Sequence, residues 1–156
     1  MAIVEIGELK AALARGQRLM GLDLGTKTIG VAMSDVLLSV ASPVETIQRT
    51  KFTKDAMRLE ALMDEHGVGG LVLGLPKEMD GTEGARCQST RDFARNFLNR
   101  RDVPIALWDE RLSTSAVERM LVGDVDMTRK RRGQVIDKLA ATYILQGALD
   151  ALARHM

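Results

Sequence analysis

The stretch Leu19-Met-Gly-Leu-Asp-Leu-Gly-Thr-Lys-Thr-Ile-Gly-Val-Ala-Met-Ser-Asp35 predicts two strands joined by a tight turn. The first strand, 19–24, is almost wholly apolar, which is typical of a strand covered on both faces. Gly25-Thr-Lys27 turns the chain, and 28–34 returns with β-branched and small residues. Asp23 breaks the pattern, because a carboxylate in a core strand is costly unless it is paired, hydrogen-bonded or bound to a cation.

The composition is that of an ordinary globular domain. The chain has 156 residues, of which 46% are hydrophobic and 28% charged, enough to bury a substantial core. A net charge of +1 excludes a strongly basic protein but not a nucleic-acid-binding one, since local segregation of charge matters more than the total. The single cysteine, Cys87, excludes an internal disulfide framework or a Cys-based zinc site. No signal peptide or membrane-length apolar run is visible, so we expect a cytoplasmic protein without a membrane partner.

The remaining pattern predicts an α/β fold with one mixed five-stranded sheet flanked by helices. Further strands are expected at 37–47, which is interrupted near Pro43 and therefore an edge or bulged strand, and at 70–74 and 103–109. Helices are expected at 52–66, 85–99, 113–121 and 134–152, with a loop over 123–132. We expect residues 1–17 to be a helical extension packed on the edge of a single domain spanning 18–156.

Three acidic residues lie where a structural acid would be awkward. Asp23 ends the first strand, and Glu110 follows the last, with Asp109 as its competitor. Asp137 shares a helical stripe with Ala141, Ile144 and other apolar or small residues, a stripe that should face the sheet. Carboxylates converging at one end of a sheet can hold Mg²⁺ or Mn²⁺, which prefer oxygen ligands, and such ions can support phosphodiester cleavage.

Each acid also has a simpler interpretation. Asp137 can be an acid in the first turn of a helix, favoured there by the dipole, and Glu110 can be a salt-bridge partner of Arg111. Three coincident exceptions nevertheless favour a shared site.

Basic residues near these acids are candidates for phosphate contacts. Thr26 and Lys27 at the turn could donate to a phosphate, or Lys27 could simply be exposed. Arg129, Lys130, Arg131 and Arg132 immediately precede the helix that carries Asp137, which favours phosphate steering over a merely solvated run. Arg91, Arg95 and their neighbours could be a solvated helix face or a phosphate contact. The loop at 75–84 follows a buried strand, where ligand sites of α/β sheets gather.

Four motifs resemble the YqgF family, also called RuvX, of RNase H-like nucleases. They are Gly21-Leu-Asp-Leu-Gly-Thr-Lys-Thr-Ile-Gly-Val-Ala32, Gly74-Leu-Pro76 with Asp80-Gly81, Asp109-Glu-Arg-Leu-Ser-Thr114 and Asp137-Lys-Leu-Ala-Ala141. The resemblance spans nearly all of 21–150 and implies a three-layer RNase H-like fold. It also implies metal-dependent phosphodiester cleavage, with a role in processing the 5′ end of precursor 16S ribosomal RNA.

Carried onto matching positions, the implied acids are Asp23, Glu110 and Asp137. We therefore expect a Mg²⁺- or Mn²⁺-dependent hydrolase acting on structured RNA, with Asp23 bridging the metals and Arg111 among the phosphate-binding residues. The rivals are a dimeric resolvase of branched DNA, a non-catalytic RNA-binding module and a sugar-kinase-like ATPase, for which the chain is too short. The sequence leaves monomer and homodimer open.

Overall fold

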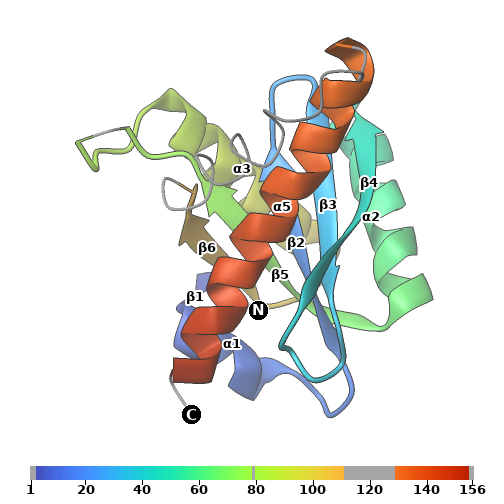
Figure 1. Ribbon diagram of the computed structural model, residues 1–156, viewed down its shortest axis with the longest axis vertical. Helices are drawn as coiled ribbons and strands as arrows, with labels where there is room; N and C mark the ends of the chain where they lie inside the picture. The colour runs from blue at the N-terminus through green and yellow to red at the C-terminus, as the bar shows by residue number, and fades with distance from the viewer. Residues whose placement is uncertain (1–2, 79, 111–128, 155–156) are drawn as a thin grey trace.

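The computed structural model describes residues 3–78, 80–110 and 129–154, with the side chains of 129–137 outside this description. Within these residues one six-stranded mixed sheet is flanked by four helices (Figure 1). The strands are β1 (Ile3–Val4), β2 (Arg18–Leu24), β3 (Thr28–Ser34), β4 (Ala41–Gln48), β5 (Val68–Leu75) and β6 (Ile105–Asp109). The helices are α1 (Ile6–Ala12), α2 (Phe52–His66), α3 (Ala85–Arg100) and α5 (Arg129–Arg154).

The strand order, β1-β6-β5-β2-β3-β4, brings the ends of several strands together. Strands β1, β6, β5 and β2 run parallel, while β3 and β4 are antiparallel to their neighbours. The carboxyl ends of β2, β5 and β6 therefore meet at one edge, together with the β2–β3 turn. The N-terminal end of α5 lies at the same end of the molecule (Figure 1).

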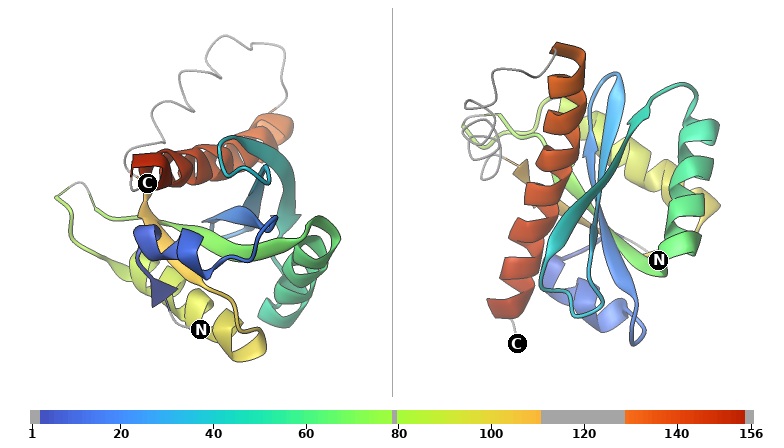
Figure 2. Two further views of the ribbon diagram at one scale, coloured as in Figure 1. Left: turned by 90° about the horizontal axis from the view of Figure 1, so that it is seen from below. Right: turned by 45° about the vertical axis from the view of Figure 1, so that its right-hand side comes forward.

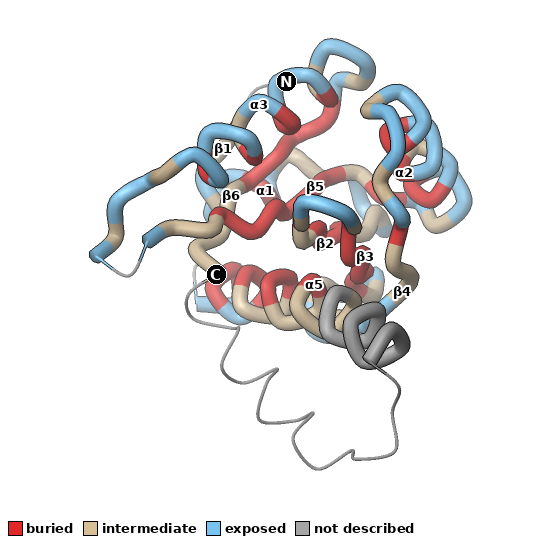
Figure 3. The backbone as a smooth tube through the Cα atoms, turned by 90° about the horizontal axis from the view of Figure 1, so that it is seen from above, coloured by how far each residue is buried: buried red, intermediate tan, exposed pale blue. Residues whose placement is uncertain are grey.

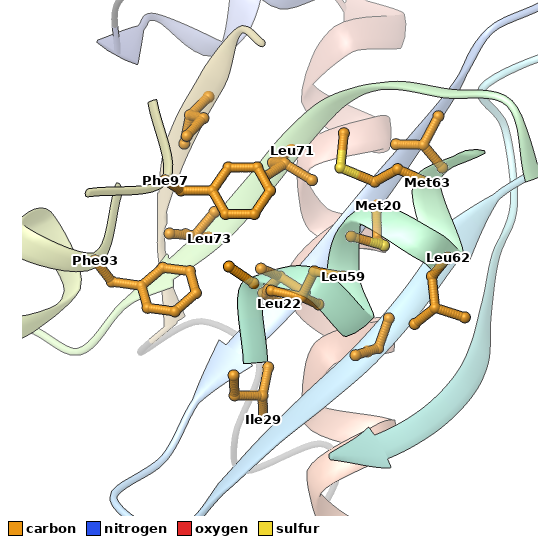
Figure 4. Close-up of a cluster of buried hydrophobic side chains, with 14 of the residues drawn as sticks. Met20, Leu22, Ile29, Leu59, Leu62, Met63, Leu71, Leu73, Phe93 and Phe97 are labelled. Atoms are coloured by element: carbon orange, nitrogen blue, oxygen red, sulfur yellow. The ribbon is translucent and has the colours of Figure 1, made fainter. Parts of the chain in front are cut away.

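The helices cover the two faces of the sheet in separate layers (Figure 2). Helices α2 and α3 pack on one face through a core that includes Leu59, Met63, Phe93 and Phe97 (Figure 4). Helices α1 and α5 pack on the other face through a second cluster. In α2, α3 and the part of α5 with described side chains, the buried residues lie on the side toward the sheet and the exposed ones away from it (Figure 3). This is the predicted three-layer α/β arrangement.

The N-terminal segment contributes the sixth strand, which the sequence pattern does not predict. Two residues, Ile3 and Val4, pair in parallel with Ile105 and Ala106 of β6. A two-residue strand is too short to show an alternating pattern. Leu9 of α1 is fully buried in the cluster beneath α5, so this helix packs against the sheet.

Two other boundaries differ from expectation or refine it. β4 is the predicted edge strand, and its register shifts next to Pro43, where a β-bulge accommodates the proline. Helix α5 begins at Arg129, so the basic run 129–132 forms its first turns and the prediction of a loop there is wrong. Arg and Lys are good helix formers, although their charges oppose the dipole at this end. The helix expected at 113–121 lies outside the described residues.

Helix α5 crosses β2 at very short range because Gly21 has no side chain. A Cβ atom built on Gly21 would lie 2.7 Å from Leu145 Cβ and 3.1 Å from the Ala141 carbonyl oxygen. Neither atom is the end of a flexible side chain, so the helix itself would have to move. The position of α5 over the sheet is therefore set by this glycine.

We predict that Gly21→Ala lowers the free energy of unfolding by about 1–3 kcal/mol, because an added methyl group overpacks this contact. Urea denaturation followed by circular dichroism measures the change. Gly69→Ala in β5 is the matched control, since the three atoms nearest to its Cβ would all belong to the flexible side chain of Gln17. Its effect should stay within about 0.5 kcal/mol. Equal losses in the two variants would contradict the role assigned to Gly21.

Candidate active site

The carboxyl groups of Asp23 and Glu110 lie within hydrogen-bonding reach of each other at the carboxyl-end edge of the sheet. Asp23 is the penultimate residue of β2, and Glu110 follows the last residue of β6. Both residues are half-buried. β5 lies between their two strands, so the side chains approach each other across the middle strand.

Gly74 of β5 makes this approach possible. A Cβ atom built on Gly74 would lie 2.8 Å from Glu110 Oε2 and 2.5 Å from Ile144 Cδ1 of α5. Glu110 therefore occupies space that any other residue at position 74 would fill. The Gly74-Leu-Pro76 motif thus has a direct steric role at the site.

Burial raises the pKa of Glu110 above its ordinary value. The charge of Arg86 and the hydrogen bond with Asp23 oppose this rise in pKa, and the nearby charge of Asp109 adds to it. A hydrogen bond between two carboxyl groups needs a proton on one of them, since carboxylates only accept. The pair is therefore costly when both groups are ionised and no cation is present.

Glu110 rather than Asp109 faces this site. Trp108 packs into the cluster beneath α5, where its ring lies against Gly147. A Cβ atom built on Gly147 would lie 2.8 Å from Trp108 Nε1. Side chains alternate between faces along a strand, so Glu110 follows Trp108 onto the α5 face while Asp109 is directed to the other.

Asp137 lies in the N-terminal part of α5, which is at the same end of the molecule as Asp23 and Glu110. Its side chain lies outside the described residues. It precedes Ala141 by one helical turn, and the Ala141 carbonyl lies over Gly21. One turn advances about 5.4 Å along the helix, and the two residues from Gly21 to Asp23 advance about 6.6 Å along β2. α5 starts at the end where β2 finishes, so the backbone of Asp137 lies near the level of Asp23.

The predicted basic residues are placed unevenly. Thr26 and Lys27 form the tip of the β2–β3 turn, which is closed by a hydrogen bond from Gly25 N to Thr28 O of 2.9 Å, and both are exposed. Residues 129–132 lie in the first turns of α5, and nothing is described of their side chains. Arg111 lies outside the described residues.

The loop after β5 is held by its own polar groups. Asp80 Oδ1 accepts hydrogen bonds from Thr82 N and Oγ1 at 3.0 and 2.6 Å. Arg91 donates two hydrogen bonds to the Glu83 carboxylate, at 2.7 and 2.8 Å. Arg91 thus anchors the loop to α3, and the bidentate pair favours a structural role for it over a phosphate contact.

The other candidate arginines of α3 are also paired with acids. Arg95 binds Asp92, and Arg100 and its neighbour Arg101 bind carboxylates of α2. Arg86 is the exception, and it was not among the residues predicted from the sequence to contact phosphate. The sequence did contain a signal for Arg86. The helix dipole disfavours a cation in the first turn of a helix, so an arginine at that position suggests a functional role.

No helix among the described residues is long and apolar enough to cross a membrane. The described side chains, which do not include that of Asp137, contain no group of three or more His, Cys, Asp or Glu residues placed to hold a metal ion.

Comparisons with known proteins agree with this architecture. The chain is 63% identical to the "Putative pre-16S rRNA nuclease" of Paramagnetospirillum magneticum, with 96% of each chain covered. It is 61% identical to the protein of the same name from Rhodospirillum rubrum, over 99% of this chain and 96% of the relative.

Among solved structures, Thermus thermophilus RuvC has a TM-score of 0.52 at 13% identity, over 89% of this chain and 98% of the other. The fowlpox virus Holliday junction resolvase has a TM-score of 0.50 at 10% identity, over 87% and 100%. These likenesses establish the fold. The family model described as "RuvX: Holliday junction resolvase" matches residues 17–151. The chain therefore belongs to the RuvX family of nucleases.

Proposed function

We propose that this nuclease is a divalent-metal-dependent endonuclease that cleaves phosphodiester bonds of structured nucleic acid, with Asp23, Glu110 and Asp137 as its catalytic acids. The observation that carries the proposal is the pair of carboxyl groups meeting over Gly74. The pair lies at the strand ends where ligand sites of α/β sheets gather. Asp137 is included because its helix begins at the same edge and because the family resemblance implies it.

The chemistry of the pair suits a hard cation. Two half-buried carboxyl groups at hydrogen-bond distance repel when both are ionised, and a divalent cation removes that cost. Carboxylate oxygens are the ligands that Mg²⁺ and Mn²⁺ prefer. When bound, such an ion supplies activation of a water molecule and stabilises the developing charge on phosphate oxygens.

The protein's own contribution in this proposal is positioning. Gly74 and Ile144 confine the Glu110 carboxylate, and the β2–β3 pairing fixes the backbone of Asp23 opposite Gly30. Thr26 and Lys27 at the adjacent turn, Arg111, and Arg129, Lys130, Arg131 and Arg132 would bind phosphates of the substrate. Exposed cations around a carboxylate pair raise the local concentration of a polyanion.

We further propose that the substrate is the 5′ end of precursor 16S ribosomal RNA, with Mg²⁺ or Mn²⁺ as cofactor. The names of relatives at 63% and 61% identity, covered at 96% of their length, support this assignment. Cleavage of a transcript carrying that precursor end by the purified protein, with each metal and with EDTA, tests it.

A branched-DNA resolvase is the second candidate, because the matching family model is described as a Holliday junction resolvase. Resolution of a junction requires two symmetrically placed sites, and hence a dimer. Light scattering of the protein with synthetic junction DNA, beside the RNA cleavage assay, separates the two substrates. Paired cuts in the junction by a dimer, without cleavage of the RNA, would favour the resolvase.

We predict that Asp23→Asn lowers the cleavage rate by about 10³-fold or more, since several kcal/mol of charge stabilisation are lost. Binding of the RNA should change little, because the substitution does not touch the exposed cations. Rates and filter-binding affinities measure the two effects. Asp64→Asn is the matched control, because Asp64 is exposed on α2 and pairs only with Arg101 among the described residues. Cleavage at the full rate by Asp23→Asn would refute the assignment.

We also predict that, in the metal-free protein, Glu110→Gln raises the free energy of unfolding more at pH 7 than at pH 4. The pKa of Glu110 is raised above its ordinary 4.5, so its contribution to stability is full below that value and is lost as pH rises through the folded pKa. Glutamine keeps the uncharged shape and removes this loss. Urea denaturation in EDTA at both pH values measures it.

The control for this prediction is Glu65→Gln, which changes an exposed acid of α2. Because this side chain is exposed, the substitution should change stability by no more than about 0.5 kcal/mol. Added Mg²⁺ or Mn²⁺ should stabilise the wild-type protein and have a much smaller effect on Glu110→Gln. Equal effects of Glu110→Gln at pH 4 and pH 7 would contradict the buried-carboxyl interpretation.

A further inference from the structure

A small pocket opens at the same end of the sheet as the carboxylate pair, but on the face covered by α2 and α3, between the β2–β3 turn and α3. Its volume is about 60 Å³, and we call it the anion pocket. It is lined by Leu24, Gly25, Thr26, Arg49, Arg86, Ser89, Thr90 and Phe93. The lining thus holds two arginines and three hydroxyl groups, and no carboxylate. Leu24 and Gly25 directly follow Asp23, so the pocket and the carboxylate pair share one edge of the sheet.

No carboxylate in the described part of the chain forms a hydrogen-bonded ion pair with Arg86. Other arginines of α3, at 91, 95 and 100, are each bound to an acid. Arg86 is exposed at the mouth of the pocket, and its charge reaches Glu110, where it opposes the rise in the pKa of that carboxyl.

Arg49 is held in a fixed orientation in the pocket wall. Its Nη1 donates to the Gly25 carbonyl at 2.6 Å, and its Nε lies 4.0 Å from Asp55 Oδ2. The guanidinium carbon lies 6.0 Å from the centre of the Phe93 ring, which also lines the pocket. A guanidinium carries five N–H donors in a rigid fork, so donors remain available for a ligand.

We propose that the anion pocket binds one internal phosphate of the nucleic-acid strand whose scissile phosphate lies at Asp23 and Glu110. The inference rests on the proposed function for the place of the scissile phosphate. About 10–15 Å³ of such space holds one water molecule, so the pocket has room for the oxygens of a phosphate group. Two arginines and the hydroxyls of Thr26 and Ser89 provide the donors, and arginine matches phosphate geometry.

The decisive variant is Arg86→Gln, assayed with the full chain in EDTA. The probe is an RNA strand carrying the precursor 5′ segment of 16S ribosomal RNA. We expect about five- to tenfold weaker binding, and a slope of log affinity against log salt smaller by about 1, because one phosphate contact is lost. Arg95→Gln, on the exposed face of the same helix, should leave both quantities unchanged.

A second measurement locates the phosphate. A series of probes carries one uncharged methylphosphonate linkage each, at successive internal positions. For the wild-type protein, one position should weaken binding about as much as Arg86→Gln does, and the variant should be insensitive to that same position. The proposal is overturned if Arg86→Gln and Arg95→Gln bind alike, or if no internal linkage distinguishes wild type from variant. Dependence on a 5′-terminal phosphate alone also overturns it.

The two proposals fail separately, because these measurements need no cleavage. If the Arg86 effects appear while the protein cuts no substrate with Mg²⁺ or Mn²⁺, the endonuclease proposal falls and a phosphate-binding pocket remains. If cleavage occurs and depends on Asp23, but Arg86→Gln binds as the wild type does, only the anion pocket is lost. Thermal unfolding of Arg86→Gln checks that the fold is kept, and an unchanged midpoint is expected for an exposed side chain.

Discussion

The close approach of the carboxyl groups of Asp23 and Glu110 sets a condition that the surrounding structure must meet. Two acidic side chains can approach each other this closely only where no other side chain fills the space between them. β5 provides that space by placing Gly74 between them, and α5 closes it with Ile144. The order β6-β5-β2 is what puts the glycine strand in the middle. The site is thus a property of the sheet as much as of the two acids.

The same condition explains why α5 lies so close to the sheet. Gly21 and Gly74 on the strands, and Gly147 on the helix, each leave out a side chain that would separate the two layers. Without these contacts the helix would stand farther from the strand ends. Its first turns, with the basic run and Asp137, would then move away from the carboxylate pair. Close packing and the proposed chemistry therefore depend on the same small residues.

Much of this could be predicted from the sequence because the signals were local. Asp23 is conspicuous in an apolar strand, and the limits of β3 and α2 follow from their patterns. Strand β1 could not be predicted, since two residues carry no periodicity. The start of α5 was misjudged because residues 123–132 carry no periodic apolar pattern, whereas most helical stability comes from the packing of the rest of the helix.

The anion pocket could not be predicted for a different reason. Arg49 and Arg86 come from separate elements, and only the fold shows that they line one hollow. The sequence marks Arg86 only as a cation in the first turn of α3, whereas the structure shows that Arg91, Arg95 and Arg100 are each paired with an acid. The periodicity of a sequence describes single helices and strands, so it does not show which residues from separate elements come together in the fold.

The two-residue strand β1 also affects how the molecule behaves among its own copies. An open sheet ends in rows of unpaired backbone groups, which invite another chain to add a strand. Here β4 ends one side with a proline-associated bulge, and β1 covers part of β6 on the other. The N-terminal segment therefore pairs with backbone groups of β6 that would otherwise be open to strand addition by another chain. A chain shortened to begin at β2 would leave β6 as a bare template for self-association.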